Sequence, residues 1–253
     1  MTETCHRHRF PAREGQCVPD VSLRVRRNGD WATVTSNELF AHRNVVVFSL
    51  PGAFTPTCSS THLPRYNELA PAFKAAGIDS IVCVSVNDPF VMEAWARDQE
   101  AANVTLVPDG NGEFTEKMGL LVDKSDLNFG KRSWRYSMLV RDGRIDKMFI
   151  EPDEPGDPFK VSDADTMLAY LNPRAKKPDQ VAILTREGCS FCAKAKRLLS
   201  DADIAYAEVP LGHAIRTRVV GAITGAQTVP QVFINGKLIG NAEDLERYLK
   251  RAA

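Results

Sequence analysis

Residues 44–60 read NVVVFSLPGAFTPTCSS, and this stretch joins an apolar run, a proline-rich loop and a cysteine. The run NVVVFSL is typical of a short apolar strand. Pro51 and Pro56 then keep the chain irregular, because proline lacks the backbone N–H that helices and strands use. Apolar residues recur at helical spacing from Thr61 onwards. The stretch therefore predicts a strand, a stiff loop, and a helix with Cys58 at its start.

The alternation of strand and helix continues downstream. The helix that follows Cys58 is expected to reach Ala75, and residues 80–86 (SIVCVSV) predict a second buried strand. Asp88 and Pro89 supply an N-cap and a first-turn proline for a helix that ends at about residue 101. Residues 104–112 then predict a strand that ends in a turn. This order indicates an α/β domain with parallel strands.

The first domain is expected to end in antiparallel strands and one more helix. Asp142-Gly143 lies between two apolar segments, residues 135–140 and 144–150, and this dipeptide tolerates the positive φ of a tight hairpin turn. Ser162 is the expected N-cap of a helix that runs to about Leu171. The sequence thus predicts a hairpin packed beside the parallel strands.

A polar segment with two prolines, residues 172–180 (NPRAKKPDQ), predicts a linker. After it the pattern starts again, with expected strands at 181–185, 204–209, 231–234 and 237–240 and helices at 190–200, about 213–222, and from about 242. This is the element order of a small thioredoxin-like domain. We therefore predict an α/β fold of two thioredoxin-like domains in tandem, with bounds 1–171, 172–180 (linker) and 181–253.

Composition is that of a soluble globular protein. The 253 residues are 43% hydrophobic and 25% charged, and the formal net charge is zero, which gives no electrostatic case for nucleic-acid binding. No apolar run approaches the ~18 residues of a membrane span. The N-terminus lacks the apolar segment of a secretory signal, so we expect a cytoplasmic protein. Six cysteines are too few for a disulfide scaffold, and they are expected to be thiols.

A C-x-x-C motif follows the strand 181–185. Cys189 would lie at a helix N-terminus, where free backbone N–H groups and the helix dipole stabilise a thiolate. Cys192, one turn further on, could resolve a mixed disulfide. Half a zinc site is the alternative, but zinc needs two more ligands at similar spacing, and the sequence has no second C-x-x-C or H-x-x-x-H. The motif therefore predicts a redox-active dithiol.

Three segments of the second domain together resemble glutaredoxin: REGCSFC (186–192), TVP (228–230) and GNAED (240–244). The resemblance covers about residue 180 to the C-terminus. It implies glutathione as a reducing cosubstrate, no tightly bound cofactor, and a cis bond before Pro230. Arg186 would lie near the glycyl carboxylate, and Val229 would pair with the cysteinyl backbone. The implied glutathione-binding residues are Arg186, Thr228, Val229, Pro230, Asn241 and Asp244.

Cys58 has no neighbouring thiol, so it suits attack on a small oxidant better than dithiol exchange. Attack on a peroxide oxygen requires a thiolate, a donor that aligns the peroxide, and a cation that stabilises the developing alkoxide. Thr55 can provide the hydroxyl donor, and Pro51 can shield the pocket from water. The pattern indicates a thiol that reacts with peroxide.

The spacing P-x-x-x-T-x-x-C resembles the peroxiredoxin signature, and PGAFTPTCSSTHLP (51–64) is similar to the type-five subgroup. The resemblance spans about residues 13–171 and implies a distant arginine at the site. WRYSMLVRDG (134–143) resembles the strand that carries it, which makes Arg135 the first candidate and Arg132 the second. A solvated strand-edge charge is the alternative for Arg135. His62 either orders the pocket or is a satisfied helix-face histidine.

No cysteine occurs between Val84 and Gly188, so a Cys58 sulfenic acid has no resolving thiol in that range. Cys83 lies within a strand and is expected to be a small buried hydrophobe. A metal site is not expected, because nothing in the sequence orders its candidate ligands, Cys5, His6, His8 and Cys17. Glutathione is the reductant that the second domain implies.

The sequence thus predicts a glutathione-dependent thiol peroxidase. It would reduce hydrogen peroxide and small alkyl hydroperoxides through a Cys58 sulfenic acid, and Cys189 would remove glutathione from Cys58. Glutathione reductase would be an indirect partner, and we expect a homo-oligomer. Two alternatives stay open: a protein deglutathionylase, and an iron–sulfur-binding glutaredoxin, each with a non-catalytic first domain. The preferred peroxide and the need for Cys192 are also open.

Overall fold

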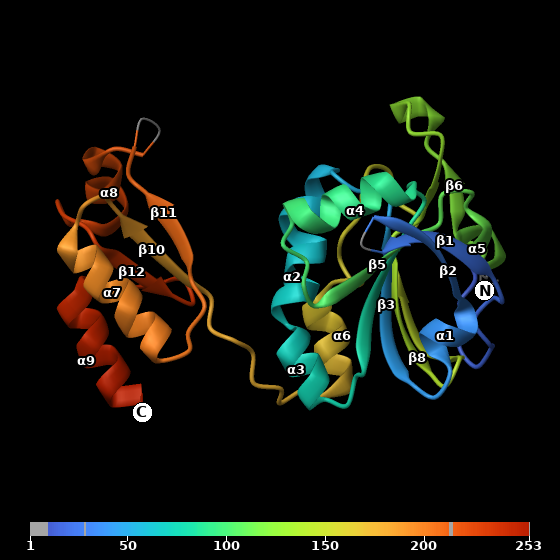
Figure 1. Cartoon of the computed structure of the whole chain (residues 1–253), viewed down its shortest axis with the longest axis horizontal. Helices are drawn as coiled ribbons and strands as arrows, with labels where there is room; N and C mark the ends of the chain where they lie inside the picture. Colours follow the sequence, from blue (N-terminus) through green and yellow to red (C-terminus); the bar gives the residue numbers. More distant parts are fainter. Residues whose placement is uncertain (1–9, 28, 213–214, 253) are drawn as a thin grey trace, which may run out of the picture. The chain divides into compact units, whose positions relative to one another are not determined.

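The computed structural model describes three ranges, residues 10–27, 29–212 and 215–252, and divides into two compact units (Figure 1). The division falls between Lys177 and Pro178, within the segment 172–180. The described helices include none that is long and apolar enough to cross a membrane. Three of the candidate metal ligands lie outside the described residues: Cys5, His6 and His8.

The first unit contains a five-stranded sheet with the order β5-β4-β3-β8-β9. Three strands are parallel, and the last two are antiparallel to their neighbours. Their bounds are Asn44–Leu50 (β3), Ser80–Ser85 (β4), Val104–Pro108 (β5), Tyr136–Arg141 (β8) and Arg144–Ile150 (β9). The predicted strand β3 is central and is buried on both faces. The α/β class of the first domain is confirmed.

Alternate residues of β3 enter hydrophobic clusters on opposite faces of the sheet, because successive side chains of a strand point to opposite sides. Val46 and Phe48 pack in a cluster that includes residues of the helices after Cys58 and of α4 (Pro89–Asp98) and α6 (Ala164–Leu171). Val45 and Val47 belong to the cluster on the other face, with residues of β1 (Ser22–Arg27), α1 (Ser36–Phe40) and α5 (Glu113–Lys117). The sheet is therefore a central layer between two cores.

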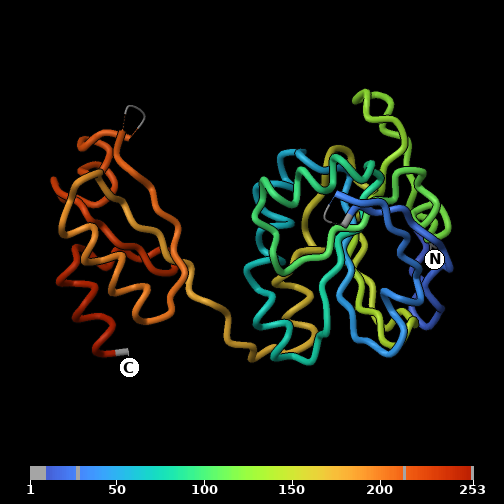
Figure 2. Tube along the Cα trace, in the orientation of Figure 1, coloured from blue at the N-terminus to red at the C-terminus, as the bar shows by residue number. Residues whose placement is uncertain are grey.

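The helical segment after the Cys58 loop is broken into three pieces: η1 (Cys58–His62), α2 (Leu63–Glu68) and α3 (Ala70–Ala75). The prediction of one continuous helix to Ala75 is wrong, because Pro71 lies in the first turn of α3 and provides no N–H for a continuous helix. α2 and α6 contact each other and lie side by side (Figures 1 and 2). Their ion pair joins Arg65 to Asp165 at 2.7 Å.

Local sequence signals account for several other elements. Asp88 caps α4 by accepting from the amides of Phe90 and Val91, as predicted. The 142–143 turn has positive φ at both residues and joins β8 to β9 as the predicted hairpin. Ser162, in contrast, is not the N-cap of α6. Asp163 accepts from Thr166 N, while the hydroxyl of Ser162 donates to Glu151 instead.

Several short elements of the first unit are not among those the sequence predicts. They are the antiparallel hairpin of β1 with β2 (Asp30–Thr35), helices α1, α5 and η2 (Ser125–Leu127), and the pair β6 (Leu121–Asp123) with β7 (Lys131–Ser133). β6 and β7 have three residues each, too few for a periodic pattern to show.

The second unit is a four-stranded sheet with the order β11-β10-β12-β13. The strands are Val181–Thr185 (β10), Ala207–Pro210 (β11), Gln231–Ile234 (β12) and Lys237–Gly240 (β13), and the helices are Ser190–Asp201 (α7), Thr217–Thr224 (α8) and Ala242–Ala252 (α9). β10 is parallel to β11 and antiparallel to β12. The predicted element order is confirmed. Helix α8 begins at Thr217, four residues after the predicted start at His213, which lies outside the described residues.

Candidate active sites

The loop 51–57 brings the Cys58 thiol to the end of the central strand. β3 ends at Leu50, and Cys58 begins η1 with its side chain 0% exposed. The loop is tied to the bend that follows the neighbouring strand β4, because Ala53 N donates to the side chain of Asn87 at 3.0 Å. The carbonyl of Thr55 accepts from the amide of Ser59 at 3.0 Å, and this bond starts the helical turn. The nucleophile is thus held by local backbone bonds.

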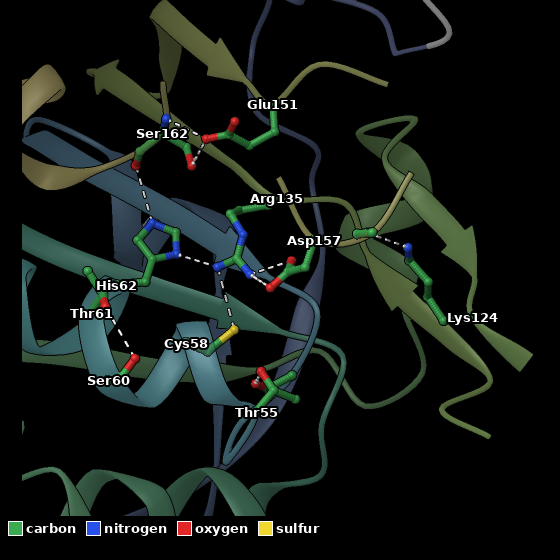
Figure 3. Close-up of polar contacts among 12 residues, drawn as sticks. Thr55, Cys58, Ser60, Thr61, His62, Lys124, Arg135, Glu151, Asp157 and Ser162 are labelled. Atoms are coloured by element: carbon green, nitrogen blue, oxygen red, sulfur yellow. Dashed lines mark hydrogen bonds and ion pairs between the residues drawn. The ribbon is translucent and has the colours of Figure 1, made fainter. Parts of the chain in front are cut away.

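Arg135 is the cation of this site. Its neighbour Tyr136 pairs with Ser49 in the β3–β8 register, which brings Arg135 close to the end of β3. The guanidinium is 1% exposed, and its Nη1 donates to the sulfur of Cys58 at 3.5 Å (Figure 3). Arg132, the second candidate, donates to the carbonyl of Val86 instead. Arg135 is therefore not a solvated strand-edge charge.

His62 fixes the position of the guanidinium. Its Nε2 lies 3.2 Å from the carbonyl of Ser162, and a carbonyl oxygen only accepts, so Nε2 carries the proton. Nδ1 is then the acceptor that faces Arg135 Nη1 at 3.1 Å. Burial and the charge of Arg135 lower the pKa of His62 to about 3. The histidine is neutral at physiological pH and orders the site.

Asp157 is a site residue that the sequence does not reveal. Both of its carboxylate oxygens accept from Arg135 Nη2, each at 2.5 Å, although the two residues are 22 positions apart. Burial alone would lower the pKa of Arg135, but the bonds to Asp157 and the neighbouring Cys58 raise it above its usual range. The guanidinium is also 5.4 Å from the Phe159 ring. Both terminal nitrogens of Arg135 thus have partners, whereas its buried Nε has none among the described residues.

A buried carboxylate anchors the loop that carries Asp157. Glu151 is 2% exposed and accepts from the amides of Lys160, Val161 and Ser162 at 2.8–2.9 Å. The hydroxyl of Ser162 donates to the same side chain at 2.7 Å. These bonds close the loop 152–161 over the site, and they place the carbonyl of Ser162 where His62 can donate to it.

A pocket of ≈ 340 Å³ opens beside the Cys58 loop. Pro51 and Thr55 are partly exposed in its wall, and the hydroxyl of Thr55 donates to the carbonyl of Gly52 at 2.9 Å. The remaining lining residues are Pro56, Thr57, Lys124, Leu127, Phe129, Gly156 and Asp157. The predicted residues Pro51, Thr55, Cys58 and Arg135 therefore meet at one end of the sheet.

The second unit holds the dithiol at the start of α7. Cys189 is the N-cap, and its sulfur accepts from the amide of Cys192 at 3.3 Å. Although burial opposes it, hydrogen bonds from the thiol of Cys192 and from backbone amides, together with the charge of Arg186, lower the pKa of Cys189. Burial and the thiolate acceptor Cys189 raise the pKa of Cys192 to about 11. Cys189 is the thiol that ionises first.

A pocket of ≈ 370 Å³ lies beside Cys189, and it is lined by most of the predicted ligand residues: Arg186, Thr228, Val229, Pro230 and Asn241. The peptide bond before Pro230 is cis. Asp244 is not part of this lining. Its carboxylate accepts from the amide of Asn241, whose side chain accepts from the amide of Asp244. This reciprocal pair is the arrangement that caps a helix, here α9.

Two other cysteines, Cys17 and Cys83, lie in the described part of the chain. Cys83 is 0% exposed, and burial raises its pKa, as expected of a small hydrophobe in a core. Cys17 is an exposed free thiol. Within the described ranges, no three His, Cys, Asp or Glu residues are arranged to hold a metal ion.

Comparisons with known proteins agree with this arrangement. The Redoxin family model matches residues 13–168, and the Glutaredoxin model matches residues 181–239. The hybrid peroxiredoxin hyPrx5 of Haemophilus influenzae is 61% identical over 235 residues, which are 93% of this chain and 98% of that protein. The chain belongs to the hybrid peroxiredoxins. It is accordingly a peroxidase-type oxidoreductase with a peroxiredoxin domain followed by a glutaredoxin domain.

Other relatives match the peroxiredoxin domain by itself. A peroxiredoxin of Synechocystis, sll1621, is 62% identical over 145 residues, which are 56% of this chain and 77% of that protein. Among solved structures, reduced Prx3 of Vibrio vulnificus in complex with hydrogen peroxide has a TM-score of 0.59 and 41% identity, and covers 62% of this chain and 98% of that chain. The Cys58 site lies in the peroxiredoxin domain and the Cys189 pair in the glutaredoxin domain.

Proposed function

We propose that this hybrid peroxiredoxin is a glutathione-dependent peroxidase that reduces hydrogen peroxide and small alkyl hydroperoxides. The observation that carries the proposal is the contact of the buried cation Arg135 with the Cys58 sulfur at 3.5 Å. A guanidinium in this position can stabilise the negative charge that leaves the sulfur during the reaction. Glutathione is the expected cosubstrate, and no tightly bound cofactor takes part.

The first step is oxidation of Cys58. The thiolate attacks one peroxide oxygen, a sulfur–oxygen bond forms, and the oxygen–oxygen bond breaks. Sulfur loses two electrons to the departing hydroxide or alkoxide, which takes a proton and leaves as water or alcohol. Arg135 is aimed at the reacting atoms, Thr55 is the group that aligns the peroxide, and Pro51 shields the pocket. The product is a Cys58 sulfenic acid.

The second step returns Cys58 to the thiol. Glutathione attacks the sulfenic sulfur, releases water and leaves a mixed disulfide. Cys189 then attacks the glutathione sulfur and frees Cys58. A second glutathione frees Cys189 as glutathione disulfide forms, or Cys192 displaces the glutathione and leaves a Cys189–Cys192 disulfide, which two further glutathione molecules reduce. The lowered pKa of Cys189 and the pKa of about 11 for Cys192 support this division of roles. The pocket beside Cys189 supports glutathione binding by Arg186, Thr228, Val229, Pro230 and Asn241.

The two domains share one chain, and a tether raises the effective concentration of one site at another. The relay would operate within one chain or between the chains of a homo-oligomer, which we expect in the cytoplasm. Asp244, the sixth residue that the glutaredoxin resemblance implies, would act at the γ-glutamyl end only through Asn241, which it contacts.

The test is NADPH consumption coupled through glutathione and glutathione reductase, with hydrogen peroxide as substrate. We expect Cys58→Ser to abolish turnover with any reductant. Cys189→Ser should abolish turnover with glutathione and retain turnover with dithiothreitol, which reduces the sulfenic acid directly. Unchanged glutathione-driven turnover in Cys189→Ser would rule out the internal relay. Deglutathionylase activity without any peroxidase activity in the wild type would rule out the proposal as a whole.

A further inference from the structure

The pocket beside Cys58 is larger than hydrogen peroxide needs. Its volume of ≈ 340 Å³ is at the small end of the range for pockets that bind organic ligands. Cys58 itself is 0% exposed and is not among the lining residues, so the narrow hydroperoxide end is the part of a substrate suited to approach the sulfur. The rest of a larger substrate would stay in the pocket, and the pocket wall would select it.

The outer wall of this pocket is apolar. Leu127 and Phe129 line it and are 54% and 38% exposed. Leu127 ends the short turn η2 and Phe129 follows it, in the segment that connects β6 to β7. Neither side chain is buried in a core of the first unit. Exposed apolar side chains that line a pocket are typical of a surface that contacts a ligand. An apolar chain would cover them.

Lys124 is the cation among the described residues that line the pocket, and the Arg132 guanidinium lies 5.9 Å from the Phe129 ring. The ammonium of Lys124 lies 5.1 Å from the Trp134 ring and 3.5 Å from the carbonyl of Gly156, on the far side of Asp157 from Arg135 (Figure 3). No carboxylate in the described part of the chain pairs with it. The nearest acidic wall residue, Asp157, has both oxygens engaged by Arg135. The positive charge of Lys124 is therefore available to an anionic ligand.

These observations define a ligand with three parts. A hydroperoxide fits the end near Cys58, an apolar chain fits against Leu127 and Phe129, and an anionic group fits at Lys124. We propose that Lys124 makes this peroxidase selective for organic hydroperoxides that carry a carboxylate on an apolar chain, the class of oxidised unsaturated fatty acids. Glutathione also has carboxylates, but it has no apolar chain for Leu127 and Phe129 to contact.

The reaction follows the proposed function, on which this inference rests. The Cys58 thiolate attacks the outer oxygen of the hydroperoxide, the oxygen–oxygen bond breaks, and the inner oxygen leaves with the chain as an alkoxide. That alkoxide takes a proton and becomes a hydroxy acid. The carboxylate takes no part in the electron transfer and serves to bind the substrate.

The experiment compares matched acids and neutral analogues in the full-length chain, with dithiothreitol as reductant. The pairs are linoleic acid 13-hydroperoxide with its methyl ester, and 4-carboxycumene hydroperoxide with cumene hydroperoxide. The readout is the ratio of kcat/KM for the acid to kcat/KM for the neutral analogue. An ion pair at a surface contributes at most about fivefold, so we expect a ratio near five in the wild type for at least one pair. Sodium chloride should reduce it by screening.

Two variants isolate the charge. Lys124→Met keeps the apolar stem, and its ratio should fall to about one. Lys131→Met removes a nearby charge at the start of β7, outside the pocket lining, and this variant should keep the wild-type ratio. A wild-type ratio of one for both pairs, or an equal loss in both variants, overturns the inference. Absence of hydrogen peroxide turnover in the wild type would instead overturn the proposed function.

Discussion

The neutral, buried His62 predicts that the peroxiredoxin domain loses stability as the pH falls. In the unfolded chain a histidine has a pKa near 6.5, whereas burial and Arg135 lower the pKa of His62 to about 3. Between these two pKa values, His62 is protonated in the unfolded state and neutral in the folded state. The free energy of unfolding therefore rises with pH across this window, and the stabilisation is lost as the pH falls from 6.5 towards 3.

The size of the effect follows from linkage, because each pKa unit corresponds to about 1.36 kcal/mol. Lowering the pH from 7 to 4.5 crosses roughly two units below the unfolded pKa, and the folded histidine is still neutral at the end. His62 should thus remove about 2.5 kcal/mol from the free energy of unfolding over this interval. Carboxylates add their own pH dependence, so the contribution of His62 must be measured as a difference.

The variant His62→Gln supplies that difference. Its side-chain amide can donate to the carbonyl of Ser162 and has an oxygen to accept from Arg135, but it does not titrate. All three tryptophans, Trp31, Trp95 and Trp134, lie in the first unit, so tryptophan emission during urea unfolding reports this domain. We expect the wild type to lose about 2.5 kcal/mol more than the variant between pH 7 and 4.5. Equal losses would refute the assignment of a neutral His62.

Three further predictions concern the two sites. A lysine at position 135 cannot contact Cys58, His62 and Asp157 together, so in Arg135→Lys the rate constant for hydrogen peroxide, measured by stopped-flow fluorescence, should fall about 100-fold. In Arg132→Lys this rate constant should fall far less, and equal losses would contradict the assignment of Arg135. Asp157→Asn removes one acceptor from a buried guanidinium and should lower the free energy of unfolding by about 1–2 kcal/mol in the same urea assay, and an unchanged midpoint would speak against the pair. Iodoacetamide at pH 7 should modify Cys189 well before Cys192, as judged by peptide mass spectrometry, because the pKa of Cys189 is lowered and that of Cys192 is raised; equal rates would exclude this order.

The parts of the site that the sequence predicts are those that local chemistry decides. Pro51, Thr55 and Cys58 are close in the chain, and the strand before them and the helix after them have strong patterns. The turn at Asp142 is equally local. Arg135 is distant from Cys58 in the chain, and it was predictable only because its segment resembles that of a known family. The pairing of β3 with β8 is what brings it to the thiol.

The parts that were missed depend on contacts between distant residues. Asp157 lies in a segment of prolines, glycine and acidic residues that a local reading assigns to a turn, and nothing local indicates that the loop folds back on Arg135. Ser162 and Asp163 are both good N-cap residues, so the sequence does not choose between them. Glu151 determines which residue is the N-cap, because it accepts from the hydroxyl of Ser162, and Asp163 then caps α6.

The burial of Cys58 gives a physical reason for the proposed use of a small thiol to connect the chemistry of Cys58 with that of Cys189. Its sulfur is fully covered, so a thiol on a folded surface cannot reach a Cys58 sulfenic acid directly, and in the proposed relay glutathione is the small thiol that does so. In the proposed mixed disulfide, the sulfur that Cys189 would attack lies one bond further out, about 2.05 Å from the Cys58 sulfur. The glutathionyl group thus extends the buried thiol outwards. Cys189 is partly exposed at a helix start and has the lowered pKa that such an attack requires.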